Sequence, residues 1–145
     1  MRKATRILAV MALALAGTLA VATPANALSG PHYWMYSDDS NSGGRVDFWS
    51  DGDHVKLCDV RADGRTAQLK VADATTGYNI LYTLTASGNG VCDAAHASQG
   101  GARNLPEGHC IWFQIYLTDS STYVSGSADT AQWANDNEFA FNCNP

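Results

Sequence analysis

The stretch that decides the fold is CIWFQIYLT, residues 110–118. Its side chains alternate with the period of two that is typical of a β-strand with one buried face. The residues of one face are all apolar: Ile111, Phe113, Ile115 and Leu117. The residues of the other face are Trp112, Gln114 and Tyr116. The stretch therefore predicts a strand that packs on a core with one face and carries aromatic rings on the other.

Shorter segments of the same kind lie before and after this strand, and turn residues separate them about every 8–12 residues. The expected strands are, in chain order, 33–36, 45–50, 54–60, 66–72, 79–86, 110–118, 122–125 and 138–143. Tight turns at Asp51-Gly52 and at residues 75–77 are each expected to join two of them as a hairpin. Seven or eight such strands predict an all-β fold, an antiparallel β-sandwich that is immunoglobulin-like in architecture.

The first 27 residues have the composition of a secretory signal peptide. Basic residues at the start precede an apolar run at about 7–21, and Ala25-Asn26-Ala27 supplies the small residues of a cleavage site. A membrane anchor is the alternative, because the run is close to spanning length. Small residues dilute the run and an Ala-x-Ala site ends it, which favours cleavage. We expect residues 1–27 to be removed and residues 28–145 to form one secreted domain.

Acidic residues dominate the remaining chain. The whole sequence has 9 Lys and Arg against 14 Asp and Glu. Three of the basic residues lie in the signal segment: Arg2, Lys3 and Arg6. Without them, six basic residues face fourteen acidic ones, a formal net charge of −8. Because such a surface repels phosphate backbones and anionic headgroups, we expect neither nucleic acid nor a membrane as partner.

The four cysteines predict two disulfides, since their count is even and the domain is expected to be exported. Antiparallel partners lie at equal distances from their turn. Cys58 and Cys92 centre on the turn at 75–77, and Cys110 and Cys143 centre on Gly126-Ser127. We therefore expect the pairs Cys58–Cys92 and Cys110–Cys143. No close cysteine pair of the kind that binds zinc is present.

The second pair also predicts a register. If Cys110 and Cys143 face each other across a hairpin, then Trp112 lies opposite Phe141 and Gln114 lies opposite Phe139. That hairpin would be apolar on one face and aromatic on the other, and a slip by one residue would exchange the two faces.

The segment Cys58-Asp59-Val60-Arg61-Ala62-Asp63-Gly64 carries a family resemblance. It is similar to the CD-x-x-ADG segment of small, mostly uncharacterised secreted proteins of actinobacteria, in which it joins two strands. Gly90-Val91-Cys92 and Glu107-Gly108 resemble later features of those proteins, although their third cysteine lies near the position of Tyr116 rather than at Cys110. The resemblance implies secretion and a β-sandwich, and it implies no activity.

The sequence shows no constellation typical of an enzyme or of a cofactor site. Its histidines occur singly: His32, His54, His96 and His109. Neither a metal-binding histidine spacing nor a G-x-S-x-G nucleophile turn is present. We therefore expect a protein that is not an enzyme and that needs no cofactor.

Four aspartates lie close together in the sequence: Asp51, Asp53, Asp59 and Asp63. If the two connections that carry them meet at one end of a sheet, their carboxylates could bind Ca²⁺. Asp beside Gly is also the preferred chemistry of turns, and Arg61 and Arg65 would neutralise the cluster locally. We favour turn chemistry and expect no metal.

Aromatic side chains are the strongest functional signal. Tyr33, Trp34 and Tyr36 lie beside a polar loop at 37–40, and Trp and Tyr in such places bury large rigid areas against ligands. Core packing is the alternative interpretation. We expect a secreted, non-enzymatic domain that binds an extracellular glycan or a protein surface. The expected contact residues are Tyr33, Trp34 and Tyr36 at one edge of the sandwich, with Trp112 and Tyr116 as second choice.

A proteinaceous inhibitor of a secreted hydrolase is the alternative function. The Gly-rich segment 93–109 would be its protruding loop on a rigid body with two disulfides. The sequence gives no sign of the oligomeric state.

Overall fold

The computed structural model describes residues 28–138 and 142–143. The expected signal peptide, residues 1–27, lies outside the described residues. In the described part of the chain, no helix is long and apolar enough to cross a membrane. The helical elements found there are two short 3-10 turns, Ala97–Gln99 and Gly101–Arg103.

Four strands form the first sheet, sheet A, in the order β1-β2-β3-β6 with antiparallel neighbours. The strands are β1 (His32–Tyr36), β2 (Gly44–Trp49), β3 (His54–Asp59) and β6 (Cys92–Ala95). The hairpin predicted at Asp51-Gly52 is confirmed, because Trp49 pairs with His54. Gly52 at φ 78° and Asp53 at φ 54° make the turn in the left-handed region, which glycine adopts freely and aspartate tolerates.

The second sheet, sheet B, has the order β5-β4-β7-β8, and β9 also pairs with β7. Its strands are β4 (Thr66–Asp73), β5 (Asn79–Ser87), β7 (His109–Asp119), β8 (Thr122–Tyr123) and β9 (Asp129–Asn135). The predicted hairpin of β4 with β5 is confirmed by the pairing of Thr66 with Ser87 and of Asp73 with Asn79.

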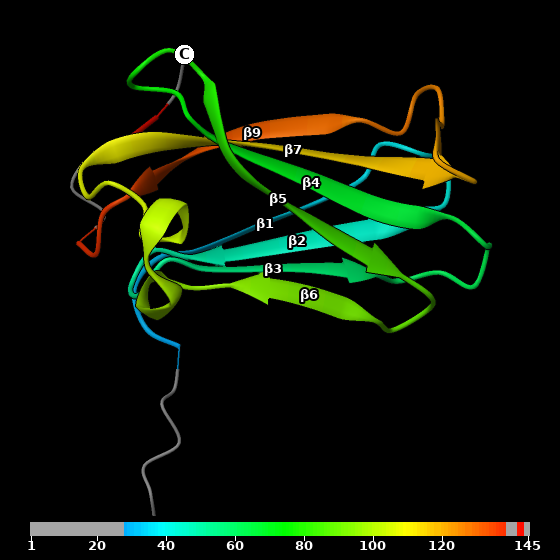
Figure 1. The fold of residues 1–145 in the computed structure, drawn as a ribbon, viewed down its shortest axis with the longest axis horizontal. Helices are drawn as coiled ribbons and strands as arrows, with labels where there is room; N and C mark the ends of the chain where they lie inside the picture. The colour runs from blue at the N-terminus through cyan, green and yellow to red at the C-terminus, as the bar shows by residue number, and fades with distance from the viewer. Residues whose placement is uncertain (1–27, 139–141, 144–145) are drawn as a thin grey trace, which may run out of the picture.

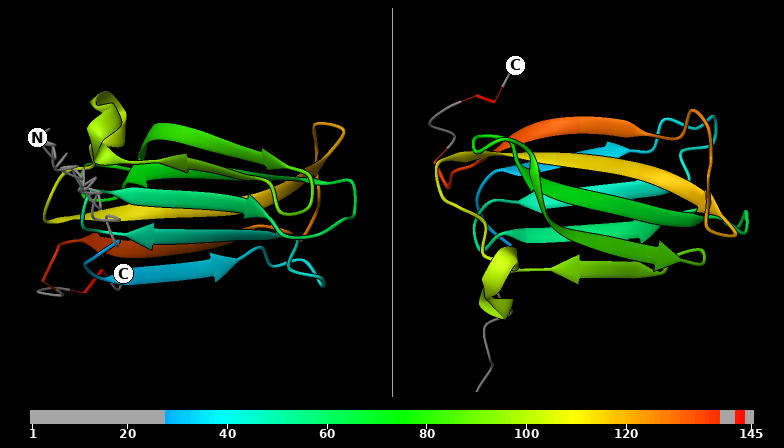
Figure 2. Two further views of the ribbon diagram at one scale, coloured as in Figure 1. Left: turned by 90° about the horizontal axis from the view of Figure 1, so that it is seen from below. Right: turned by 45° about the horizontal axis from the view of Figure 1, so that its top comes forward.

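The two sheets pack face to face as a β-sandwich, which confirms the expected all-β fold (Figures 1 and 2). In Figure 1, β4, β5 and β7 lie in front of β1, β2 and β3. The apolar face predicted for residues 110–118 points into the space between the sheets, where its side chains are buried: Ile111, Phe113, Ile115 and Leu117. The inward residues of β2 and β3 meet them from sheet A: Val46, Phe48, Val55 and Leu57. Each such side chain contributes about 1.5–3 kcal/mol by burial.

Both predicted disulfides are confirmed. Cys58 and Cys92 lie directly opposite each other on β3 and β6, so this bond crosses neighbouring strands of sheet A. Cys110 and Cys143 are also bonded, with their Cα atoms 5.6 Å apart. Each bond closes a loop of more than thirty residues, for which chain entropy gives about 3–4 kcal/mol.

The register predicted from the second disulfide is wrong. β7 lies between β4 and β9, so that Ala72 and Gln132 lie opposite Trp112, and Lys70 and Thr130 lie opposite Gln114. The expected partners Phe139 and Phe141 lie outside the described residues. The described residues Glu138, Asn142 and Cys143 are not in a strand, contrary to the strand expected at 138–143. A disulfide requires only that two Cα atoms come within reach, so it can tie a segment that follows a strand.

Burial of Trp133 explains why β9 takes this place. Trp133 lies opposite Ile111 and packs on Phe113 and Phe48, with ring centroids 4.8 and 6.3 Å away. β9 and β6 are the two strands that the sequence did not predict. β6 has only four residues, and its side chains do not alternate between apolar and polar.

Candidate ligand-binding surface

The outer face of sheet A carries a group of aromatic and charged side chains, which we call the aromatic platform. Alternation along β1 and β2 places these residues on one face, away from the core: His32, Trp34, Tyr36, Arg45, Asp47 and Trp49. Of these, only Trp34 and Tyr36 were expected as contact residues. Arg45, Asp47 and Trp49 could have been found from their alternation with the apolar Val46 and Phe48 in segment 45–50, and His32 from its even spacing with Trp34 and Tyr36.

Trp34 and Tyr36 form the exposed part of the platform. Trp34 is 57% exposed and Tyr36 is 36% exposed, although both belong to regular sheet. Their rings meet edge to face, with centroids 5.8 Å apart. The guanidinium carbon of Arg45 lies 5.8 Å from the centroid of Trp34 and 5.6 Å from that of Tyr36. Arg45 therefore holds both rings by cation–π contact.

Asp47 fixes the position of Arg45. Its carboxylate accepts hydrogen bonds of 2.9 Å from Nε and 2.6 Å from Nη2 of Arg45. The ring of His32 lies 2.9 Å from the same carboxylate through Nε2. The hydrogen bonds and charge of Asp47 raise the pKa of Arg45, in spite of partial burial, which lowers it. Because the pair is bidentate, the guanidinium plane is held in one orientation beneath the two rings.

Stacked rings extend the platform along the sheet. His32 on β1 stacks on Trp49 of β2, with centroids 4.3 Å apart and planes 3° apart. Farther across sheet A, His54 and His96 stack at 5.6 Å. The outer face therefore offers a row of flat rings rather than an enclosed cleft.

An open hollow adjoins the platform at Tyr36. It has a volume of about 410 Å³ and is lined by Tyr36, Ser42, Arg45, Val60 and Arg61. Arg61 is exposed, and its Nε donates a hydrogen bond of 2.8 Å to the carbonyl of Asn41. Two arginines and two hydroxyl groups thus surround a space that continues from the aromatic rings.

Tyr33 does not belong to this surface, although it was expected to. It points toward the core, where its ring stacks on Trp133 and Phe48 at 5.6 and 6.1 Å. Burial and the negative charge of Asp136 raise the pKa of its hydroxyl. The sequence could not show which of Tyr33 and Trp34 is buried, because each of the two faces of β1 carries an aromatic side chain.

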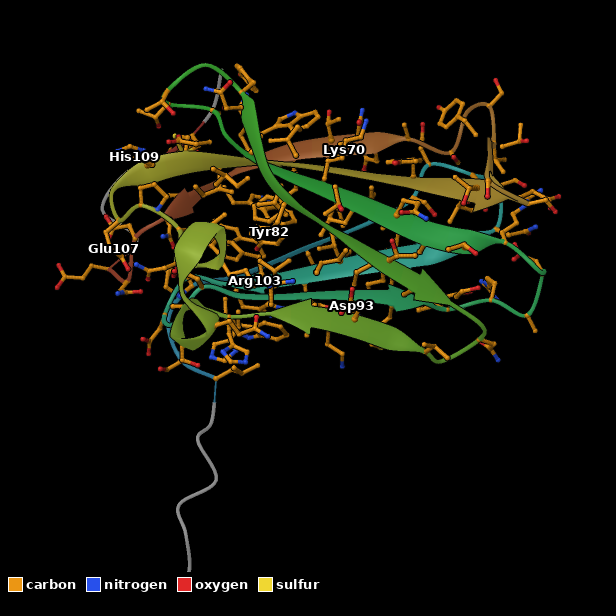
Figure 3. All side chains as sticks on the ribbon, viewed as in Figure 1. Lys70, Tyr82, Asp93, Arg103, Glu107 and His109 are labelled. Atoms are coloured by element: carbon orange, nitrogen blue, oxygen red, sulfur yellow. A yellow bond between two sulfur atoms is a disulfide. The ribbon has the colours of Figure 1, made fainter. Side chains whose placement is uncertain are left out.

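The second-choice residues Trp112 and Tyr116 lie on the outer face of sheet B, the opposite side of the sandwich. Figure 3 views this face, and Lys70 lies on it. The ammonium of Lys70 is 5.3 Å from the ring of Tyr116. Trp112 is half-buried and meets the edge of Tyr78 at 6.1 Å. The second-choice residues Trp112 and Tyr116 would therefore form a contact surface separate from that of Trp34 and Tyr36.

The four aspartates of the sequence cluster do not converge. Asp51 and Asp53 precede β3, whereas Asp59 is its last residue and Asp63 follows it, so a strand of about 20 Å separates the two pairs. Asp59 accepts hydrogen bonds from the backbone of Arg61 and Gly88, which is turn chemistry. Among the described residues, no group of three or more His, Cys, Asp or Glu side chains could hold a metal ion.

The segment 93–109 leaves β6, makes the two 3-10 turns and returns to β7. Its end is tied to the body, since Leu105 N donates to the buried carboxylate of Asp53 at 2.7 Å. Arg103 lies over the ring of Tyr82, 5.9 Å from its centroid, at the end of the sandwich where the turns lie (Figure 3). The exposed residues of the turns are small or polar.

A second hollow, of about 600 Å³, lies at the end of sheet A beside the same turns. His54, His96 and Asp51 are among its lining residues. His96 Nδ1 lies 2.7 Å from Ser98 Oγ. The stacked imidazoles of His54 and His96 continue the outer face of sheet A at this end.

No protein-family model, no curated protein and no solved structure matches this chain. The resemblance to secreted actinobacterial proteins therefore stays a prediction.

Proposed function

We propose that this chain is a secreted, non-enzymatic domain that binds an extracellular polysaccharide through the aromatic platform. The observation that carries the proposal is the exposure of Trp34, which is 57% exposed in the middle of a regular strand. Water contact with a ring of this size costs free energy, and a flat apolar partner removes that cost. The C–H face of a sugar ring is such a partner, and Tyr36 beside Trp34 supplies a second ring.

The polar groups beside these rings also suit a sugar. Arg45 is fixed by Asp47, so its position between the rings does not depend on the ligand. The hydroxyl of Tyr36 and the guanidinium of Arg45 offer hydrogen bonds at the rim of the stacking surface. A few fixed polar groups around an apolar contact are the usual basis of specificity in ligand sites.

Two disulfides support an extracellular location, because such bonds persist in oxidising compartments. An exported protein whose mass matches residues 28–145 less the four hydrogens of two disulfides would agree with the proposal. A retained N-terminal segment or free thiols would contradict it.

The inhibitor function is less well supported. A loop that inserts into a hydrolase needs an exposed side chain to fill a pocket. The exposed residues of 97–104 are small or polar, and Arg103 already packs on Tyr82. The platform offers large exposed rings, so we favour it.

The test is binding of the exported domain to a panel of insoluble and soluble polysaccharides. Trp34→Ala should weaken binding by about 2 kcal/mol, as interface anchors do, without changing the melting temperature. The matched control is Tyr123→Ala, which removes a ring that is 52% exposed on sheet B. Unchanged binding by Trp34→Ala, or an equal loss in Tyr123→Ala, would contradict the proposal.

A further inference from the structure

We propose that the polysaccharide is acidic, and that one of its carboxylate or sulfate groups binds in the hollow between Arg45 and Arg61. The inference rests on the proposed function, because it assigns the chemical class of the ligand at the same surface. Three observations support the inference. They are the residues that line the hollow, the ion pairs of the charged side chains around the hollow, and the two residues that the hollow shares with the platform.

Arg61 supplies an uncompensated positive charge. Among the residues that the structure describes, it forms no ion pair, since the ion pairs found there involve other cations: His32, Arg45, Arg65 and His109. Its Nε is held by the carbonyl of Asn41, which leaves the terminal nitrogens as donors. By contrast, Nη1 of Arg65 lies 3.9 Å from carboxylate oxygens of both Asp39 and Asp63, so the charge of Arg65 is compensated.

The acidic side chains of the neighbouring segments are hydrogen-bonded to other groups. Asp59 is buried, and its carboxylate accepts hydrogen bonds from the backbone amides of Arg61 and Gly88. The carboxylate of Asp63 accepts from the amide of Arg65 and lies beside that side chain. Asp47 is bound to Arg45 and His32 on the platform.

Arg45 also lines the hollow. Two of its nitrogens are bound to Asp47, and its Nη1 reaches the hydroxyl of Tyr36 at 3.3 Å. Guanidinium groups match the planar fork of a carboxylate and the oxygens of a sulfate. The lining hydroxyls of Tyr36 and Ser42 add two donors.

The hollow and the rings suit one ligand. Tyr36 and Arg45 belong to both, so a sugar ring stacked on the platform would bring its acidic substituent to the hollow. An acidic peptide offers the charge but no flat ring for Trp34. The net negative charge of the chain does not oppose this binding strongly, because charges farther than about 8–10 Å are screened at physiological ionic strength.

The experiment compares polymers that differ only in charge. Affinity electrophoresis measures binding to polygalacturonate and to its methyl ester, and to dextran sulfate and dextran. We expect the acidic member of at least one pair to bind about tenfold more tightly, since hydrogen bonds to charged groups have this strength. Added salt should weaken binding to the acidic polymer and leave the neutral one unaffected. The pair that shows the preference identifies the carboxylate or the sulfate.

Arg61→Gln should remove this preference and leave the weaker binding to the neutral polymer unchanged. Arg61→Lys keeps the positive charge but lacks the planar pair of N–H donors, so it should retain part of the preference for the acidic polymer. Arg103→Gln is the matched control, because it makes the same change at an exposed arginine far from the hollow. Melting temperatures show whether each variant is folded.

The outcomes separate the two proposals. Equal binding to acidic and neutral polymers would overturn the acidic ligand while the platform stands, and a preference that survives in Arg61→Gln would overturn the assignment of the acidic group to the hollow. No binding to any polysaccharide would overturn both proposals. A preference that is lost in Arg103→Gln as well would show a diffuse charge effect and would overturn the assignment to the hollow.

Discussion

The carboxylate of Asp53 accepts a hydrogen bond of 2.9 Å from the side-chain amide of Asn135, although 82 residues separate them. Asp53 lies in the β2–β3 turn and Asn135 ends β9, so the bond joins sheet A to sheet B. The same carboxylate accepts from Leu105 N. Burial raises the pKa of Asp53, and the hydrogen bonds of Asn135 and Leu105 oppose that rise.

Asp53→Ala should therefore lower the free energy of unfolding by about 2–4 kcal/mol, because it leaves the buried donors of Asn135 and Leu105 without a partner. Asp53→Asn keeps one of the two acceptor oxygens and tolerates the left-handed backbone, so its loss should be smaller. Urea denaturation measures both. Equal losses would show that the hydrogen bonds do not contribute.

Trp133 and Trp34 should respond in opposite ways to the same substitution. Trp133→Ala removes a ring that packs on Phe113, Phe48 and Tyr33 and should cost about 3 kcal/mol or more of folding stability. Trp34→Ala removes an exposed ring and should change stability by less than about 0.5 kcal/mol. Thermal and urea melts separate the two. A large loss of folding stability in Trp34→Ala would contradict the exposed position of that ring.

Asp73 should stabilise the fold in a way that depends on pH. Burial tends to raise its pKa, but hydrogen bonds from Thr76 and His109 and the charge of His109 outweigh burial, so the pKa lies below the ordinary value of 3.8. A lowered pKa means stability that is present above about pH 4 and is lost as pH falls through the folded-state pKa. Asp73→Asn should therefore melt below the wild type at pH 6, and the difference should shrink toward pH 2. A constant difference would contradict this.

Chelation should leave the melting temperature unchanged. The four aspartates of the sequence cluster lie at opposite ends of β3, and Asp59 and Asp63 accept hydrogen bonds from the backbone of their own turns. A Ca²⁺ site saturated a hundredfold over its Kd would add about 2.7 kcal/mol, which is a shift of several degrees in a domain of this size. Scanning calorimetry with EDTA and with added Ca²⁺ checks this. A shift of that size would show that these aspartates bind Ca²⁺.

Local sequence determined most of the fold. The alternation in 110–118 sets which side chains of β7 are buried, because the strand period is two and only one phase is wholly apolar. The turns at Asp51-Gly52 and 75–77 set two hairpins, since their residues adopt the backbone that a tight reversal requires. The cysteine positions predicted both disulfides, but only Cys58 and Cys92 face each other on paired strands, whereas Cys143 follows β9 and lies outside any strand.

Tertiary structure decided the partner of β7 and, with it, the candidate site. β9 pairs with β7, where the partly buried Trp133 packs against the core, and no local pattern reveals how much area a distant ring will bury. The sequence also did not show which face of β1 is buried, since Tyr33 and Trp34 are both aromatic. Tyr33 points inward, where it contacts Trp133, and Trp34 is exposed. A period determines which residues share a face. Which face is buried depends on the free energy of packing against the rest of the chain.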